Sequence, residues 1–183
     1  MKRRQHAFTL IELMVVVALT AIIVTLVGPS VRELLAVKRV QSINAEMMTD
    51  LQCARTEAVR RNQTLAVQFQ SNSAMTCYVV TAIDAAVGKC NCLETPGAVC
   101  KGGWEEIKTV QVPRKVDVSL AASSSVSTLV RFEKLAGTSL PGDFQVDVVS
   151  SVRGQLRTSV NAAGLPSVCS PDGSIVQVPK CGS

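Results

Sequence analysis

The residue with the most unusual setting for its chemistry is Glu12. It is the only charged residue in the apolar stretch 8–27, FTLIELMVVVALTAIIVTLV. A carboxylate among apolar groups is costly unless a cation or hydrogen-bond donors pair with it. Glu12 is therefore predicted to form a specific pairing with a positive group.

Side chains that carry enzyme chemistry are scarce elsewhere. His6 is the only histidine and precedes the apolar stretch, so a histidine triad or histidine metal site cannot form in the rest of the chain. The sequence has no G-x-S-x-G motif and no glycine-rich phosphate loop. Glu105 and Glu106 adjoin in an expected strand and would face opposite ways. We expect no enzymatic activity, no cofactor and no metal.

The apolar stretch has the length of a membrane-spanning helix. At ~1.5 Å per residue it reaches about 30 Å, the thickness of a bilayer's hydrocarbon core. Lys2, Arg3 and Arg4 precede it with no acidic residue, which favours a cytoplasmic N-terminus and an outward-facing body. A cleaved secretory signal has a shorter apolar core. The pattern predicts a single-pass membrane anchor.

The residues at this junction resemble those of type IV pilins and pseudopilins, whose precursors carry a short basic leader, a Gly-Phe-Thr-Leu-Ile-Glu type junction and an apolar helix. The resemblance implies a bacterial inner-membrane precursor that prepilin peptidase cleaves between Ala7 and Phe8, with methylation of the new Phe8 amine. It also implies assembly with other major and minor pilins into an extracellular filament. The chain departs from the pattern at Ala7, where the family nearly always has glycine.

Cleavage would expose the one cation at the membrane depth of Glu12, the Phe8 amine. We predict that Glu12 of one subunit pairs with the Phe8 amine of the next and sets their axial register. The alternative is a monomeric anchor in which Glu12 snorkels to the cytoplasmic interface. Pro29, directly after Gly28, is expected to kink the helix.

A second helical segment is predicted for residues 30–62. Apolar residues recur there at spacings of three and four, which places them on one stripe that must face a sheet or neighbouring helices. The stripe consists of Ala36, Val40, Ile43, Met47, Leu51, Ala54 and Ala58. Residues 51–63, LQCARTEAVRRNQ, are closely similar to the end of this helix in FimT-like minor pilins.

After residue 62 the apolar residues alternate with polar ones, which is typical of strands. Glycine and proline punctuate the pattern at hairpin spacing and predict an antiparallel sheet system. Strands are expected at 65–69, 77–83, 104–110, 116–120, 126–132, 144–149 and 155–160. Residues 130–169 resemble the C-terminal half of the GspH/FimT pseudopilin domain.

The expected fold class is therefore α+β and pilin-like. A long N-terminal α-helix, transmembrane in its first half, packs against a C-terminal antiparallel β-sheet domain. The expected division is a leader at 1–7, a transmembrane and filament-core segment at 8–29, an amphipathic helix at 30–62 and a disulfide-containing β-rich domain at 63–183.

Seven cysteines in a chain whose body faces the periplasm predict disulfides. The odd number leaves at least one thiol free or paired between molecules. Cys169 and Cys181 bracket the C-terminal tail, and a bridge between them would hold an end that otherwise frays.

The remaining cysteines allow several arrangements. Cys90 and Cys92 are too close to bridge each other comfortably, so we expect them to reach Cys77, Cys100 or Cys53. Cys53 is predicted to be either a thiol covered by a loop or a disulfide partner of the loop 90–100. The alternative is a zinc site formed by the four cysteines between 77 and 100, although no paired C-x-x-C spacing supports it.

Basic residues near the C-terminus raise DNA binding as an alternative function. Some FimT-like proteins carry a Gly-Arg-x-Arg motif that is interpreted as a DNA-binding element, but residues 164–167 of this chain read GLPS. Arg153, Arg157 and Lys180 remain as candidate phosphate contacts. So few cations would bind DNA weakly and in a salt-sensitive way, and a solvated strand face is the simpler interpretation.

The resemblance implies a minor pilin of the FimT-like group that takes part in initiating or capping type IV pilus assembly, and hence in twitching motility. A type II secretion pseudopilin is the alternative within the same structural class. A DNA receptor for natural transformation is the alternative from a different class.

Overall fold

The computed structural model describes residues 9–84, 88–122, 129–133 and 144–182. The chain divides into two compact units, Met1–Leu35 and Ala36–Ser183. We call the second unit the head. The predicted leader, together with Ala7 and Phe8, lies outside the described residues.

One helix, α1 (Leu10–Arg61), accounts for the described part of the first unit and continues into the head. It begins where the Thr9 hydroxyl oxygen accepts a hydrogen bond from the backbone N–H of Glu12 at 3.3 Å, a usual N-cap arrangement. No single described helix meets the length and hydropathy requirements for a membrane span. The segments Leu10–Thr25 and Ser30–Arg61 meet them as a pair, by length and composition.

The helix kink expected at Pro29 stays a prediction. Pro29 lies within α1 and between the two segments of that pair. Its side chain is outside the described part of the chain.

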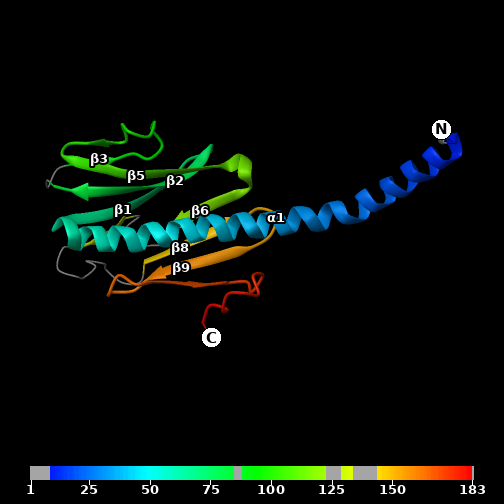
Figure 1. Ribbon diagram of the computed structural model, residues 1–183. Coiled ribbons are helices and arrows are strands. Elements are labelled where there is room, and N and C mark those ends of the chain that lie inside the picture. Colours follow the sequence, from blue (N-terminus) through cyan, green and yellow to red (C-terminus); the bar gives the residue numbers. More distant parts are fainter. Residues whose placement is uncertain (1–8, 85–87, 123–128, 134–143, 183) are drawn as a thin grey trace, which may run out of the picture. The chain divides into compact units, whose positions relative to one another are not determined.

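In the head, the predicted apolar stripe of α1 faces the core. Six of its seven residues are buried and Ile43 is half-buried against the same core. Figure 1 shows this part of α1 lying over the strands of the head. Burial of an apolar side chain such as Leu51 contributes about 1.5 to 3 kcal/mol to the stability of the fold. The buried stripe therefore holds α1 against the sheets.

The described strands of the head form two four-stranded antiparallel sheets and a small ribbon. The first sheet has the order β5-β2-β1-β7 and the second the order β10-β9-β8-β6. The strands of the first sheet are β1 (Thr64–Ser71), β2 (Met75–Ile83), β5 (Trp104–Pro113) and β7 (Leu129–Phe132). Those of the second sheet are β6 (Val118–Ala122), β8 (Phe144–Ser150), β9 (Gln155–Val160) and β10 (Pro166–Cys169). The ribbon pairs β3 (Lys89–Cys90) with β4 (Cys100–Lys101).

Both sheets and α1 share one core. Phe69 of β1 packs against Tyr78 of β2 and Phe144 of β8, with ring centroids 5.5 and 5.6 Å apart. The Thr76 hydroxyl accepts a hydrogen bond from the Leu120 backbone N–H at 3.0 Å and so joins the two sheets. A fold of helix packed on antiparallel sheets is therefore confirmed.

The expected strands are present, and β1, β2, β5 and β8 run beyond the ends that were expected. Further differences concern β6, β7 and the short strands. β6 begins at Val118 because Arg114–Val116 form a short 3-10 helix, η1, which ends at Asp117 with φ +58°. β7 is described only from Leu129, because residues 126–128 lie outside the described residues. The short strands β3, β4 and β10 were not predicted, since two to four residues show too little alternation to be recognised.

Candidate functional site

Glu12 lies in the first turn of α1, and its side chain is exposed. A carboxylate at this position interacts favourably with the positive end of the helix dipole. Within the described residues, no side chain pairs with the Glu12 carboxylate. The predicted partner, the Phe8 amine, lies outside the described residues, so the pairing between subunits remains a prediction.

The other polar side chains of this segment are satisfied within the helix itself. The Thr20 hydroxyl donates to the Val17 carbonyl at 2.9 Å, and the Thr25 hydroxyl donates to the Ile22 carbonyl at 2.8 Å. The large apolar side chains around them are exposed, Leu10 by 76% and Val24 by 67%. Such a surface is compatible with lipid or with neighbouring apolar helices, because no polar group is left unsatisfied at the threonines.

Three disulfides fasten the head. Cys169 and Cys181 are bonded, with Cα atoms 4.9 Å apart, so the predicted bridge closes the C-terminal tail. Cys77 is bonded to Cys92, and Cys90 to Cys100. The four sulfurs of the zinc alternative are therefore all in disulfides. No group of three or more potential ligands among the described residues could hold a metal.

Both expectations for Cys53 are wrong, because its thiol is free and exposed on α1. The reason lies in the two faces of β2. Tyr78 and Val80 face the core under α1, whereas Cys77 and Val79 belong to a separate cluster with the disulfide-bonded ribbon. The first sheet therefore separates Cys53 from the cysteines that it was expected to join.

The structure shows how each candidate DNA contact is placed. The Arg157 guanidinium donates to the Asp147 carboxylate at 2.7 and 2.8 Å, and this contact raises the pKa of Arg157. Arg157 is thus part of a partly buried ion pair and not of a simple solvated face. Arg153 lies in the turn between β8 and β9, and Lys180 lies in the tail beside Ser170.

A partly buried polar cluster that was not predicted from the sequence joins α1 to the first sheet. The Tyr78 hydroxyl donates to Asp50 at 2.7 Å, and the Lys108 ammonium contacts Asp50 at 2.7 Å and Glu46 at 3.0 Å. Burial, reinforced by the hydrogen bond to Asp50, raises the pKa of Tyr78. One signal was present in the sequence, because Asp50 directly precedes Leu51 of the apolar stripe.

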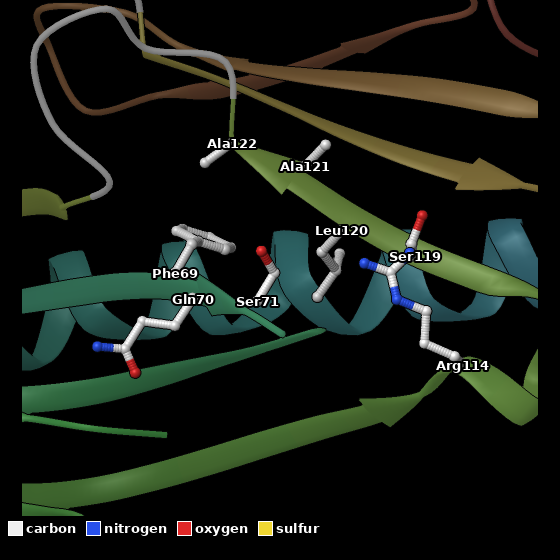
Figure 2. Close-up of a pocket in the computed structure, with 8 residues that line it drawn as sticks. All are labelled: Phe69, Gln70, Ser71, Arg114, Ser119, Leu120, Ala121 and Ala122. Carbon is white, nitrogen blue, oxygen red and sulfur yellow. The ribbon is translucent and has the colours of Figure 1, made fainter. Parts of the chain in front are cut away.

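The cavity of about 340 Å³ beside β1 and β6 has no catalytic arrangement. Arg114, labelled in Figure 2, lines it, and its guanidinium donates to the Asn72 carbonyl at 3.4 Å. The Gln70 side-chain amide donates a hydrogen bond to the Cys90 carbonyl and accepts one from the Cys92 backbone N–H. The lining is completed by Phe69, Ser71, Leu120, Ala121 and Ala122.

Two family models match this sequence. The prokaryotic N-terminal methylation motif matches residues 2–28, and the model of the type II transport protein GspH matches residues 45–164. The chain belongs to the GspH family. As a GspH-family protein it is a pilin-like structural protein and not an enzyme.

The fold of this GspH-family protein is also found in crystal structures of the type IV minor pilin FimU from Pseudomonas aeruginosa (strain PAO1). In space group P21 the likeness has a TM-score of 0.52 at 16% identity, over 72% of this chain and 88% of FimU. In space group P65 the TM-score is 0.49 at 16% identity, over 70% of this chain and 90% of FimU. The P21 comparison supports the pilin-like fold. No curated protein sequence matches the chain.

Membership of the GspH family carries two coarse consequences. It implies processing by prepilin peptidase and assembly with other pilins. The N-terminal motif, followed by the apolar part of α1, suggests anchoring in the inner membrane.

Proposed function

We propose that this GspH-family protein is a minor pilin that takes part in initiating or capping type IV pilus assembly. One observation carries the proposal: the same chain has a methylation motif at 2–28 and a helix that continues into a GspH-type head. The head is closed by three disulfides, which suits a protein that is exposed outside the cytoplasm.

In this proposal, prepilin peptidase cleaves between Ala7 and Phe8 and the Phe8 amine is methylated. Mass spectrometry and N-terminal sequencing of the mature protein test the step, with a methylated Phe8 as the expected first residue. Ala7→Gly should leave processing intact or improve it. Another first residue would contradict the cleavage site.

Glu12 then pairs with the Phe8 amine of a neighbouring subunit. Its exposed carboxylate at the start of α1 supports this role. Glu12→Ala should enter the membrane normally but fail to join filaments, as measured by immunoblotting of membrane and sheared-pilus fractions. Glu33→Ala, which removes another carboxylate from α1 outside the apolar stretch, is the matched control and should assemble. Normal incorporation of Glu12→Ala would remove the pairing role.

A type II secretion pseudopilin is the second candidate, favoured by the GspH model that matches residues 45–164. The pilin-like fold shared with FimU and the presence of Pro29 favour the pilus. A deletion strain separates the two functions. Loss of twitching motility with normal secretion supports the pilus, and the reverse result supports the secretion system.

A further inference from the structure

Exposed basic side chains gather at the end of the head where α1 enters it. We call this the basal surface. It consists of Lys38 and Arg39 on α1, Arg114 and Lys115 on η1, and Arg153 in the turn between β8 and β9.

The first contact that defines this end joins α1 to η1. The Arg39 guanidinium donates to the backbone carbonyl of Val116 at 3.4 Å. Arg114 and Lys115 are the residues immediately before Val116. The basic residues of α1 and of η1 therefore lie on neighbouring elements although more than seventy residues separate them in the sequence.

The second contact joins η1 to the β8–β9 turn. The Ser151 backbone N–H donates to the Asp117 carbonyl at 3.0 Å. Gly154, at the other end of this turn, lies so close to α1 that a Cβ placed on it would be 3.5 Å from Val37. Asp117 is the one carboxylate among residues 36–41, 114–117 and 150–154, so the surface is strongly positive.

The chain itself brings this surface close to the bilayer. Val27 ends the apolar stretch, and Lys38 follows it by eleven residues. That length spans about 16 Å as a helix and about 40 Å when fully extended. A head on so short a tether meets the lipid surface at a high effective concentration.

We propose that the basal surface binds anionic lipid headgroups on the outer leaflet of the membrane in which α1 is anchored. This inference rests on the membrane anchoring in the proposed function. Lysine and arginine side chains near a bilayer are attracted to anionic headgroups, and the binding energies of several such side chains add together. Val152, which is 52% exposed beside Arg153, supplies an apolar contact at the same place. The lipid surface is present as soon as α1 is inserted, before any other subunit joins.

The consequence is a head that is held against the membrane until assembly. Entry into a filament then requires the basal surface to leave the headgroups. Anionic lipid therefore favours the unassembled, membrane-bound state of this protein.

The test uses the full chain, inserted through α1 into nanodiscs of phosphatidylcholine with or without phosphatidylglycerol. A fluorophore on the free, exposed thiol of Cys53 reports energy transfer to an acceptor on the lipid headgroups. We expect transfer to increase with phosphatidylglycerol and to fall at high salt. Each basic side chain near an anionic surface contributes roughly a five-fold factor in partitioning. Arg114→Gln/Lys115→Gln should therefore lower the partition constant by about ten- to thirty-fold.

The matched control removes the same charge elsewhere. Lys89→Gln/Lys101→Gln changes the β3–β4 ribbon, which Figure 1 shows near the opposite end of the head from the entry of α1, and should keep the lipid dependence. Insertion of the chain without any effect of phosphatidylglycerol would overturn the inference and leave the proposed function intact. Loss of the dependence in the control as well would overturn the assignment to the basal surface. Failure to insert would refute the membrane anchoring and the inference together.

Discussion

Arg157 of β9 faces Asp147 of β8 directly in register, and its guanidinium donates two hydrogen bonds to the carboxylate. Gln155, two residues before Arg157 on the same strand, donates to the same carboxylate at 3.2 Å. Asp147 is only 9% exposed, so its negative charge depends on these donors. The arginine that looked available for phosphate is a structural element of the second sheet.

Arg157→Ala should lower the free energy of unfolding by about 2 to 3 kcal/mol, because it leaves a largely buried carboxylate without its cation. Urea denaturation measures the change. Lys115→Ala, an exposed residue on η1, should stay within about 0.5 kcal/mol of the unsubstituted protein. An Arg157→Ala protein of unchanged stability that had lost DNA binding in an electrophoretic shift assay would contradict the structural role.

Tyr78 should remain protonated as the pH rises past about 10, the ordinary tyrosine pKa. Burial and the hydrogen bond to Asp50 raise its pKa, and as the only tyrosine it alone determines the phenolate absorbance. The raised pKa means that the unfolded chain loses this proton first. The contribution to stability is therefore complete below pH 10 and declines above it.

An absorbance titration should show no tyrosine ionisation before unfolding begins. Tyr78→Phe should cost about 1 kcal/mol of unfolding free energy at neutral pH through the lost hydrogen bond. A titration midpoint near 10 in the folded protein would be incompatible with the buried contact.

Glu57 should titrate at an unusually low pH. Hydrogen bonds from Arg60 and then Arg61 lower its pKa from 4.5 to about 2. Because the pKa is depressed in the folded state, the contribution of this group to stability is present above pH 4.5 and is lost as the pH falls towards 2.

The carboxyl titration can be followed by NMR. The stability difference between the unsubstituted protein and Glu57→Gln should shrink over the same pH window. A midpoint near 4.5 would show that the two arginines do not hold Glu57 in solution.

One cysteine should react with maleimide in the native, non-reduced protein. Cys53 is the free and exposed thiol, and the other six are in disulfides. Peptide mapping should place the label on Cys53. Reduction under denaturing conditions should raise the number of labelled cysteines to seven. Cys53→Ser should abolish native labelling, and a label on any other residue would contradict the observed pairing.

Local patterns in the sequence were sufficient for much of the fold. The spacing of the apolar stripe from Ala36 to Ala58 determines which face of α1 is buried, since helical periodicity is a property of adjacent turns. The alternation in 65–69 and 155–160 likewise marks strands and their buried sides. The junction around Phe8 and Glu12 identified the same family that the motif and domain matches show.

What the sequence could not determine is which distant residues meet. Whether Cys53 reaches the loop 90–100 depends on which face of β2 lies under α1, and the pairing of Arg157 with Asp147 depends on strand register. The basal surface likewise exists only because η1 and the β8–β9 turn close against α1. A periodic pattern predicts which face of its own helix or strand a side chain lies on. The sheet order and register that choose its partner arise only when all elements pack together.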